Sequence, residues 1–378
     1  MKVLVVFGTR PEAIKMLPVV KTLQQNSAFT IRVCVTAQHR EMLDQVLNLF
    51  EVVPDHDLGI MRHAQGLTHI TTSILDKMTP VLEAEKPDYM LVHGDTTTTM
   101  AASIAAFYHR IPVGHVEAGL RSGNLAQPWP EEMNRRVTDV IADLYFAPTA
   151  SSRENLIRET VSAEKIHVTG NTVIDALYQT VARLETAPEL LRRIEKSFAF
   201  LDPELPILLV TGHRRENFGA PFLSLCEAIK ALVQRYPIQV VYPVHLNPNV
   251  QQVVQSVLQG EPRVHLITPL DYLPFVALMK RSHVILTDSG GIQEEGPSLG
   301  KPVFVMRNVT ERPEAIEAGT VRLVGTDKER IVKEVGTVLR DRSAYEAMSL
   351  AHNPYGDGRA SERISAALLG RPYAAFSA

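Results

Sequence analysis

The sequence predicts an α/β protein of two domains, each built on a doubly wound parallel sheet. Short runs rich in β-branched residues alternate with amphipathic segments of helical length along the whole chain. The short runs are apolar throughout instead of alternating with polar residues, which is typical of parallel strands covered by helices on both faces. The length of 378 residues exceeds what one ordinary core organises.

The expected strands form two sets. In the first half they are Val3–Phe7, Ile31–Thr36, Tyr89–His93, Val113–Glu117 and Ile166–Val168. In the second half they are Ile207–Thr211, Gln239–Pro243, Val264–Ile267, Val284–Thr287 and Val303–Met306. Helices are expected between them, among others at Ala13–Gln25, Thr97–His109, Phe222–Arg235 and Lys328–Arg340. This strand-helix alternation indicates parallel sheets with helical crossovers.

The alternation breaks once, between Asp175 and Phe200, where a charged helical stretch runs without a strand. We therefore expect a first domain over residues 1–170 and a second over residues 171–358. One more helix, at about residues 359–378, could pack on either domain, including back on the first.

Composition excludes several classes of protein. A net charge of −3 gives no basic surface for nucleic acid. The two cysteines, Cys34 and Cys226, lie far apart and match no metal spacing, which indicates reduced thiols in a cytoplasmic protein. The apolar run that ends at Phe7 is too short for a secretory signal, and no run is long enough to span a membrane.

The expected strands share one property at their carboxyl ends, where open α/β sheets bind ligands. Nearly every strand is followed by an ionisable residue or a glycine turn. These exits include Gly8-Thr9-Arg10-Pro11-Glu12, Gly94-Asp95, Glu117-Ala118-Gly119, Gly212-His213-Arg214-Arg215-Glu216, Val244-His245, Asp288-Ser289-Gly290-Gly291 and Glu311-Arg312-Pro313. Packing alone does not require ionisable residues and glycine turns at the carboxyl ends of the strands. The pattern therefore predicts a ligand-binding site there.

The segment Asp288-Ser289-Gly290-Gly291 opens a helix and is suited to bind phosphate. Glycines let the backbone approach a ligand, and a helix N-terminus offers free N–H groups and a positive dipole end. A tight strand-to-helix turn with Asp288 or Ser289 as N-cap explains the tetrapeptide equally well. Glu294 and Glu295 follow one turn later; one of them could bind a ribose hydroxyl, or both could only favour the helix dipole.

Three cations could neutralise a diphosphate: Arg10, Lys15 and Arg312. Arginine supplies a planar fork for phosphate oxygens and lysine a point charge. The alternative for each is ordinary surface solvation.

Three carboxylates on separate loops are candidates for acid-base chemistry, namely Asp95, Glu117 and Glu131, and His213 joins them from the second domain. A carboxylate at a strand end serves as a general base if its environment raises its pKa. Helix capping or a structural ion pair is the alternative for each of them.

Taken together, these motifs resemble the bacterial non-hydrolysing UDP-N-acetylglucosamine 2-epimerases. The motifs that carry the resemblance are Phe7-Gly8-Thr9-Arg10-Pro11-Glu12-Ala13-Ile14-Lys15, Ala37-Gln38-His39-Arg40, Val92-His93-Gly94-Asp95-Thr96, His115-Val116-Glu117-Ala118-Gly119-Leu120-Arg121, Pro130-Glu131-Glu132, Gly170-Asn171-Thr172, Thr211-Gly212-His213-Arg214-Arg215-Glu216-Asn217, Asp288-Ser289-Gly290-Gly291, Glu311-Arg312-Pro313-Glu314 and Asn353-Pro354-Tyr355-Gly356-Asp357-Gly358. Their order and spacing cover nearly the whole chain.

The resemblance implies a GT-B fold, in which two Rossmann-like domains face each other across a cleft, and a homodimer. It implies reversible conversion of UDP-GlcNAc to UDP-ManNAc without an added cofactor or metal. The implied substrate-binding residues are Arg10, Lys15, Leu270, Phe275, Ser289, Gly290, Gly291, Glu295 and Arg312, with Leu270 and Phe275 beside the uracil. The residues implied around the sugar are Asp95, Glu117, Glu131 and His213. A second UDP-GlcNAc, acting as an activator, would contact Gln38, His39, Gln65, Arg215 and His245.

The expected chemistry is elimination of UDP to a 2-acetamidoglucal followed by re-addition, which would supply ManNAc-type sugars for surface polysaccharide. Cations would stabilise the leaving diphosphate, and carboxylates would transfer the C2 proton. A hydrolysing epimerase that releases ManNAc and UDP, or a GT-B glycosyltransferase, would share the fold. An NAD-dependent oxidoreductase is disfavoured because Pro11 and Glu12 occupy the turn that should read Gly-x-Gly-x-x-Gly. A non-catalytic nucleotide-sugar sensor would have no use for several carboxylates around the sugar.

Overall fold

A computed structural model describes residues 1–377 except 38–39, 63–64, 213, 215–216 and 311. The chain divides into two compact units. Unit 1 is Met1–Gln179 together with Tyr355–Ala378, and unit 2 is Thr180–Pro354. The division falls within helix α7 (Thr172–Thr186), whereas the sequence had placed it at Gly170.

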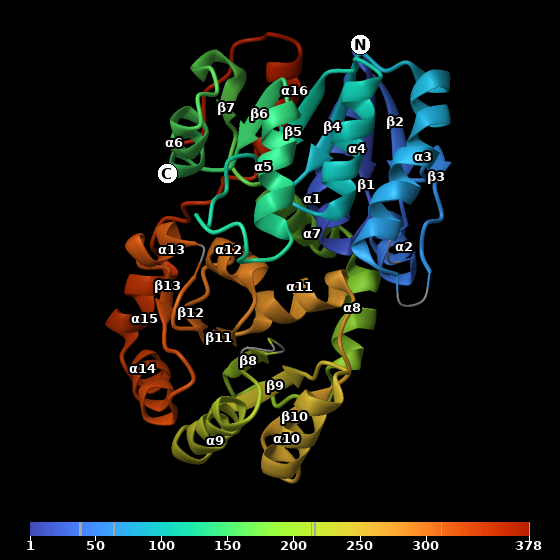
Figure 1. Ribbon diagram of the computed structural model, residues 1–378. Coiled ribbons are helices and arrows are strands. Elements are labelled where there is room, and N and C mark those ends of the chain that lie inside the picture. The colour runs from blue at the N-terminus through green and yellow to red at the C-terminus, as the bar shows by residue number, and fades with distance from the viewer. Residues whose placement is uncertain (38–39, 63–64, 213, 215–216, 311, 378) are drawn as a thin grey trace. The chain divides into compact units, whose positions relative to one another are not determined.

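Unit 1 is built on a parallel sheet with the strand order β3-β2-β1-β4-β5-β6-β7 (Figure 1). Its strands are β1 (Lys2–Phe7), β2 (Thr30–Val35), β3 (His56–Asp57), β4 (Tyr89–His93), β5 (Val113–Val116), β6 (Leu144–Ala147) and β7 (Ile166–Val168). Its helices are α1 (Arg10–Gln24), α2 (Arg40–Leu49), α3 (Leu67–Glu85), α4 (Thr97–Tyr108), α5 (Glu131–Ile141), α6 (Ala150–Arg158), α7, the 3₁₀ turn Ala163–Lys165 and α16 (Ala360–Leu368).

Strand β1 shows why its sequence is apolar without alternation. Val3, Val5 and Phe7 belong to a core with α1, α2 and α16 on one face of the sheet. Leu4 and Val6 belong to a second core with α3 and α4 on the other face. Because both faces are covered, the strand has no solvent side on which polar residues are needed.

The C-terminal helix α16 packs against α1 through Ile364 and Leu368. Its first turn is held by Asp175 of α7, which accepts hydrogen bonds from the N–H groups of Ser361 at 2.7 Å and Ala360 at 3.2 Å. The last part of the chain therefore belongs to unit 1.

Unit 2 repeats the arrangement with the parallel strand order β10-β9-β8-β11-β12-β13. Its strands are β8 (Ile207–Thr211), β9 (Gln239–Pro243), β10 (Val264–Ile267), β11 (Val284–Thr287), β12 (Val303–Val305) and β13 (Val321–Leu323). Its helices are α8 (Pro188–Ser197), α9 (Ala220–Arg235), α10 (Pro248–Leu258), α11 (Tyr272–Arg281), α12 (Gly290–Ser298), α13 (Pro313–Glu317), α14 (Lys328–Arg340) and α15 (Arg342–Ser349). The prediction of two parallel α/β domains is confirmed.

Three short strands were missing from the sequence analysis. β3 has only two residues and both are polar, and β13 alternates in burial at the sheet edge. β6 is a run of four residues that follows helix α5 after a short connection. β3 and β13 lack a continuous apolar run, whereas β6 is apolar and as long as strands that were predicted. Each of the three is defined by pairing with a neighbouring strand.

Within the described residues, no helix combines the length and the apolar character needed to cross a membrane.

Candidate active site

Each sheet reverses its strand order at one point, and open α/β sheets bind ligands beside such a point. In unit 1 the chain moves outward from β1 through β2 and β3, then returns to place β4 on the other side of β1. In unit 2, β8 and β11 are the corresponding neighbours. The hydroxyls of Thr211 and Thr287, one at the end of each of these two strands, lie 2.6 Å apart. The predicted residues after β1, β4, β8 and β11 therefore lie beside the two points of reversal.

The turn after β1 is organised by Glu12, whose side chain is buried. Its Oε2 accepts hydrogen bonds from the N–H groups of Gly8 at 3.1 Å and Thr9 at 2.8 Å. Its Oε1 accepts one from the hydroxyl of Thr96 at 2.7 Å, on the turn that follows β4. The carboxylate of Glu12 thus links the turn after β1 to the turn after β4 at the point of reversal.

Glu117, which follows β5, is the centre of a buried polar cluster. Its Oε1 pairs with Lys15 Nζ and accepts a hydrogen bond from Asn171 Nδ2 at 3.0 Å. Its Oε2 lies 3.1 Å from His93 Nε2. Lys15 comes from α1, His93 from the end of β4 and Asn171 from the turn after β7, so the cluster collects residues from four strand exits.

The charges in this cluster set the protonation state of Glu117. Burial by itself raises the pKa of Glu117, but the charges of Lys15 and His93 outweigh it and hold that pKa well below its ordinary value. The residue also has a φ of +67°, in the left-handed region where non-glycine residues are uncommon. Such strain is concentrated at functional sites, where the surrounding contacts hold it.

Asp95 lies on the turn after β4 and is held on two sides by helix α5. Its carboxylate pairs with the guanidinium of Arg135, and its backbone oxygen accepts a hydrogen bond from Asn134 Nδ2 at 2.9 Å. Glu117 lies close to the turn that carries Asp95, because a Cβ added to Gly94 would lie only 3.3 Å from Glu117 Oε2.

The two acids that begin α5 differ in environment. Glu132 is fully buried and accepts hydrogen bonds from the N–H of Ser122 at 3.0 Å and from Arg135 Nη1 at 3.1 Å. Glu131 is half-buried, and none of the described residues pairs with its carboxylate. Glu132 therefore has a structural role, and Glu131 is the one available to a ligand.

In unit 2 the turn after β11 is fixed by Asp288, which is fully buried. Its Oδ2 accepts a hydrogen bond from the N–H of Arg214, and its backbone oxygen accepts one from Arg214 Nε, both at 2.8 Å. Ser289 occupies the N-cap position of α12, but over the described residues its side chain makes no capping hydrogen bond. The first N–H groups of α12 therefore have no side-chain cap from Ser289, as a phosphate site requires.

Arg312 lies directly over the first residue of α12. A Cβ added to Gly290 would stand 2.6 Å from Arg312 Nη1 and 2.9 Å from its Cζ, so only glycine leaves room for the guanidinium. Arg312 Nε also donates to Glu294 Oε1 at 2.7 Å. The structure thus brings a predicted cation and a predicted glycine together at the amino end of this helix.

The remaining predicted residues of unit 2 surround the start of α11. Glu295 is buried, and its Oε1 accepts a hydrogen bond from the hydroxyl of Tyr272 at 2.6 Å. Leu270 and Phe275 are half-buried residues on either side of Tyr272 along the chain. Half-buried apolar side chains beside an oriented carboxylate suit a nucleoside.

Other predicted residues are only partly placed. Arg10 is half-buried at the first position of α1. Gln65 precedes α3 in unit 1 and accepts from the N–H of Arg62 at 3.2 Å, whereas His245 is exposed in unit 2. His213, Gln38, His39 and Arg215 lie outside the described residues.

Sequence reasoning missed five residues that organise these sites: Glu12, His93, Arg135, Asn171 and Tyr272. His93 and Asn171 belong to motifs at strand exits, and Glu12 occupies the first turn of α1, so position alone could have drawn attention to them. Arg135 and Tyr272 become visible only when α5 and α11 are packed beside the strand ends.

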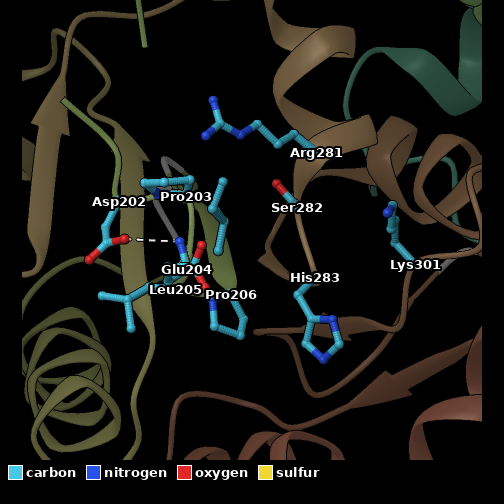
Figure 2. Close-up of a pocket in the computed structure, with 10 residues that line it drawn as sticks. Asp202, Pro203, Glu204, Leu205, Pro206, Arg281, Ser282, His283 and Lys301 are labelled. Carbon is cyan, nitrogen blue, oxygen red and sulfur yellow. Dashed lines mark hydrogen bonds between the residues drawn. The ribbon is translucent and has the colours of Figure 1, made fainter. Parts of the chain in front are cut away.

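A pocket of about 380 Å³ lies elsewhere in unit 2, beside the segments that lead into β8, β11 and β12 (Figure 2). It is lined by Asp202, Pro203, Glu204, Leu205, Pro206, Ile207, Arg281, Ser282, His283 and Lys301. In Figure 2 the charged ends of Arg281 and Lys301 do not point toward one another. Because the pocket is at the amino ends of the strands, it includes none of the predicted site residues.

Comparison with known proteins identifies the family. The family model for UDP-N-acetylglucosamine 2-epimerase matches residues 21–369. A UDP-N-acetylglucosamine 2-epimerase of Yersinia pestis is 61% identical over 369 residues, covering 97% of this chain and 98% of the relative. The chain belongs to the UDP-N-acetylglucosamine 2-epimerase family.

Solved structures of similar proteins share the fold. The UDP-GlcNAc 2-epimerase from Neisseria meningitidis bound to UDP-GlcNAc is 53% identical with a TM-score of 0.92, covering 98% of this chain and 100% of that chain. The MnaA–UDP structure from S. aureus is 45% identical with a TM-score of 0.86, covering 100% of both chains. The expected family and the expected GT-B class of fold are confirmed. Since epimerases are isomerases, the expectation of an enzyme is confirmed as well.

Proposed function

We propose that this protein interconverts UDP-GlcNAc and UDP-ManNAc without hydrolysing them. The observation that carries the proposal is the buried Lys15–Glu117–His93 cluster next to Asp95, at the point of reversal in unit 1. Family membership supplies the substrate, because similar proteins named as UDP-GlcNAc 2-epimerases have structures with UDP-GlcNAc, or with UDP-GlcNAc and UDP, bound.

The reaction we propose begins with elimination. The C2 hydrogen of the sugar is not acidic in the ground state, since no carbonyl adjoins C2. When the C1–O bond to UDP breaks, C1 gains positive character, the C2 proton passes to a carboxylate, and a C1–C2 double bond forms. Re-addition of the UDP oxygen to C1, with protonation of C2 from the opposite face, gives the epimer. Each step is redox-neutral and requires no redox cofactor.

Unit 1 supplies the acid-base groups in this scheme. Glu117 and Asp95 are placed to exchange the C2 proton, with Glu131 as a third carboxylate at the same edge. Lys15 has two possible partners, Glu117 and the diphosphate of the substrate. When the diphosphate attracts Lys15, Glu117 loses a neighbouring positive charge, so its pKa rises and it becomes a better base.

Unit 2 binds the nucleotide in this scheme. The N–H groups at the start of α12 and the guanidinium of Arg312 stabilise the diphosphate, both in the bound substrate and as a leaving group. Glu295, oriented by Tyr272, accepts a hydrogen bond from a ribose hydroxyl, and Leu270 and Phe275 contact the uracil.

Product analysis tests the proposal. Purified protein is incubated with UDP-GlcNAc, and sugars and nucleotides are separated by anion-exchange chromatography. We expect UDP-ManNAc and UDP-GlcNAc to reach equilibrium from either side, with no accumulation of free UDP. Free ManNAc together with stoichiometric UDP would instead identify a hydrolysing epimerase.

Regulation and biological role complete the proposal. We propose that a second UDP-GlcNAc acts as an activator through Gln38, His39, Gln65, Arg215 and His245, that the enzyme is a cytoplasmic homodimer, and that its product supplies surface polysaccharide. With UDP-ManNAc alone as substrate, activation predicts a lag that added UDP-GlcNAc abolishes. A linear progress curve without that addition would contradict the activator.

A further inference from the structure

His115, the third residue of β5, has an oxygen atom within hydrogen-bond distance of each ring nitrogen. The ring is fully buried. Its Nδ1 lies 2.6 Å from Asp139 Oδ1 on α5, and its Nε2 lies 2.7 Å from the backbone oxygen of Gly94. His115 takes no part in the acid-base chemistry proposed above.

Both neighbours of the ring accept hydrogen bonds. The carbonyl of Gly94 has no proton to donate. Burial raises the pKa of Asp139, but His115 and Arg121 outweigh it and hold that pKa below its ordinary value, so the carboxylate is ionised. A neutral imidazole donates from only one nitrogen. Two short contacts to acceptors therefore require a proton on each nitrogen.

The surrounding charges compensate such a cation. Asp139 lies against Nδ1, and its other oxygen pairs with Arg121 at 2.7 Å. Arg121 pairs in turn with Glu159 at 2.6 Å. Tyr145, which is paired with His115 on the neighbouring strand β6, donates its hydroxyl to the backbone oxygen of Asp139 at 2.7 Å. An imidazolium makes this group of four charged side chains neutral as a whole.

The bond to Gly94 fixes the peptide that leads into Asp95. The N–H of Gly94 donates to the backbone oxygen of Val116 at 2.9 Å, and its carbonyl accepts from His115. Gly94 has a φ of +67°, so the turn is held in a conformation that favours glycine. The carbonyl of Gly94 and the N–H of Asp95 share one peptide plane, so His115 determines the orientation in which Asp95 leaves the strand.

We propose that His115 is a positioning residue with a proton on each ring nitrogen, an imidazolium that holds the Gly94–Asp95 peptide for proton transfer by Asp95. The positioning role rests on the proposed function, and the protonation state does not. His115 touches no reacting atom and acts only through the turn that carries Asp95.

Two amide variants separate the two contacts of the ring. The amide of His115→Gln reaches the place of Nε2 and can still donate to Gly94. The amide of His115→Asn reaches the place of Nδ1 and can donate only to Asp139. Each variant loses the positive charge and one hydrogen bond, so they are matched. We expect His115→Asn to lower kcat about 10- to 100-fold with KM nearly unchanged, and His115→Gln to retain more of kcat at a similar melting temperature. Equal losses of kcat in the two variants, in step with their melting temperatures, would show a merely structural role.

The protonation state is measured on the wild-type protein, which needs no variant to fold. Long-range ¹H–¹⁵N NMR of histidine-labelled enzyme at pH 7.5, with His115 assigned through its backbone, reports whether each ring nitrogen carries a proton. We expect both nitrogens of His115 to be protonated. One unprotonated nitrogen would overturn the inference even if the enzyme is an active epimerase. Absence of epimerase activity would instead overturn the proposed function, and the positioning role with it, while a doubly protonated ring would stand.

Discussion

The two sheets share one strand order over six strands, with β7 added in unit 1, but they carry different chemistry at the point of reversal. In unit 1 the groups are side chains, and the carboxylates of Asp95 and Glu117 are each held by a cation, Arg135 or Lys15. In unit 2 the central feature is backbone, because the amino end of α12 is kept open by Gly290 beneath Arg312. Under the proposed function, the side chains of unit 1 move protons and the amino end of α12 in unit 2 binds an anion.

The comparison also shows how one topology serves two tasks. Strand order fixes where a ligand binds, and the residues after each strand decide what happens there. Changes in unit 1 should therefore lower kcat, and changes in unit 2 should weaken nucleotide binding.

The largest effect is expected from Glu117→Gln. The amide keeps the shape of the side chain but cannot accept the C2 proton, so kcat should fall about 10²- to 10⁴-fold. Binding of UDP, measured by calorimetry, should change little. Glu154→Gln, an exposed carboxylate of the same unit paired with Arg153, is the control and should retain full activity. Retention of more than a tenth of wild-type kcat by Glu117→Gln would contradict the assignment.

A smaller effect, on binding, is expected from Gly290→Ala. The new methyl group would stand 2.6 Å from Arg312 Nη1 and displace the guanidinium, so UDP should bind about 10- to 100-fold more weakly. A double-mutant cycle with Arg312→Ala tests whether the new methyl group weakens binding by displacing Arg312. If the methyl group acts by displacing Arg312, the double variant should bind UDP no more weakly than Arg312→Ala alone. Full additivity would show that Gly290 acts independently of Arg312.

A still smaller effect is expected from Tyr272→Phe, which removes the hydroxyl that orients Glu295. Affinity for UDP should fall by about 3- to 10-fold, the range of one ordinary hydrogen bond, because the lost bond only orients Glu295. Affinity for 2′-deoxy-UDP should fall less if Glu295 binds the 2′-hydroxyl. Equal losses for the two nucleotides would show that Glu295 does not bind the 2′-hydroxyl.

The smallest effect concerns stability in acid. The pKa of Glu117 is held well below its ordinary value despite burial, because of Lys15 and His93. A carboxylate with a lowered pKa in the folded state stabilises the fold above its ordinary pKa, and the contribution is lost as pH falls toward the folded-state value. The melting temperature of the wild type should therefore fall more steeply than that of Glu117→Gln once the pH drops below the ordinary pKa of 4.5, from about pH 5 to about pH 3. Parallel pH dependences would contradict this coupling.

The sequence predicted both sheets and the edge at which the predicted site residues meet, because long apolar runs and strand-exit residues are local signals. It could not predict the partners of those residues. Arg135 reaches Asp95 only because α5 packs beside β5, and Lys15 was expected on a diphosphate but pairs with Glu117. The role of Glu12 was also hidden, since its burial depends on Thr96 from a distant loop. The sequence shows which side chains follow each strand, whereas tertiary packing determines which residues they contact.

Proton exchange at C2 tests the central claim most directly. UDP-GlcNAc is incubated with the wild-type enzyme in heavy water and followed by ¹H NMR. We predict that deuterium enters C2 of both UDP-GlcNAc and UDP-ManNAc as they interconvert, and that Glu117→Gln slows exchange and interconversion together. Interconversion with the original hydrogen kept at C2, or normal exchange in both Glu117→Gln and Asp95→Asn, would contradict proton transfer by the carboxylates of unit 1.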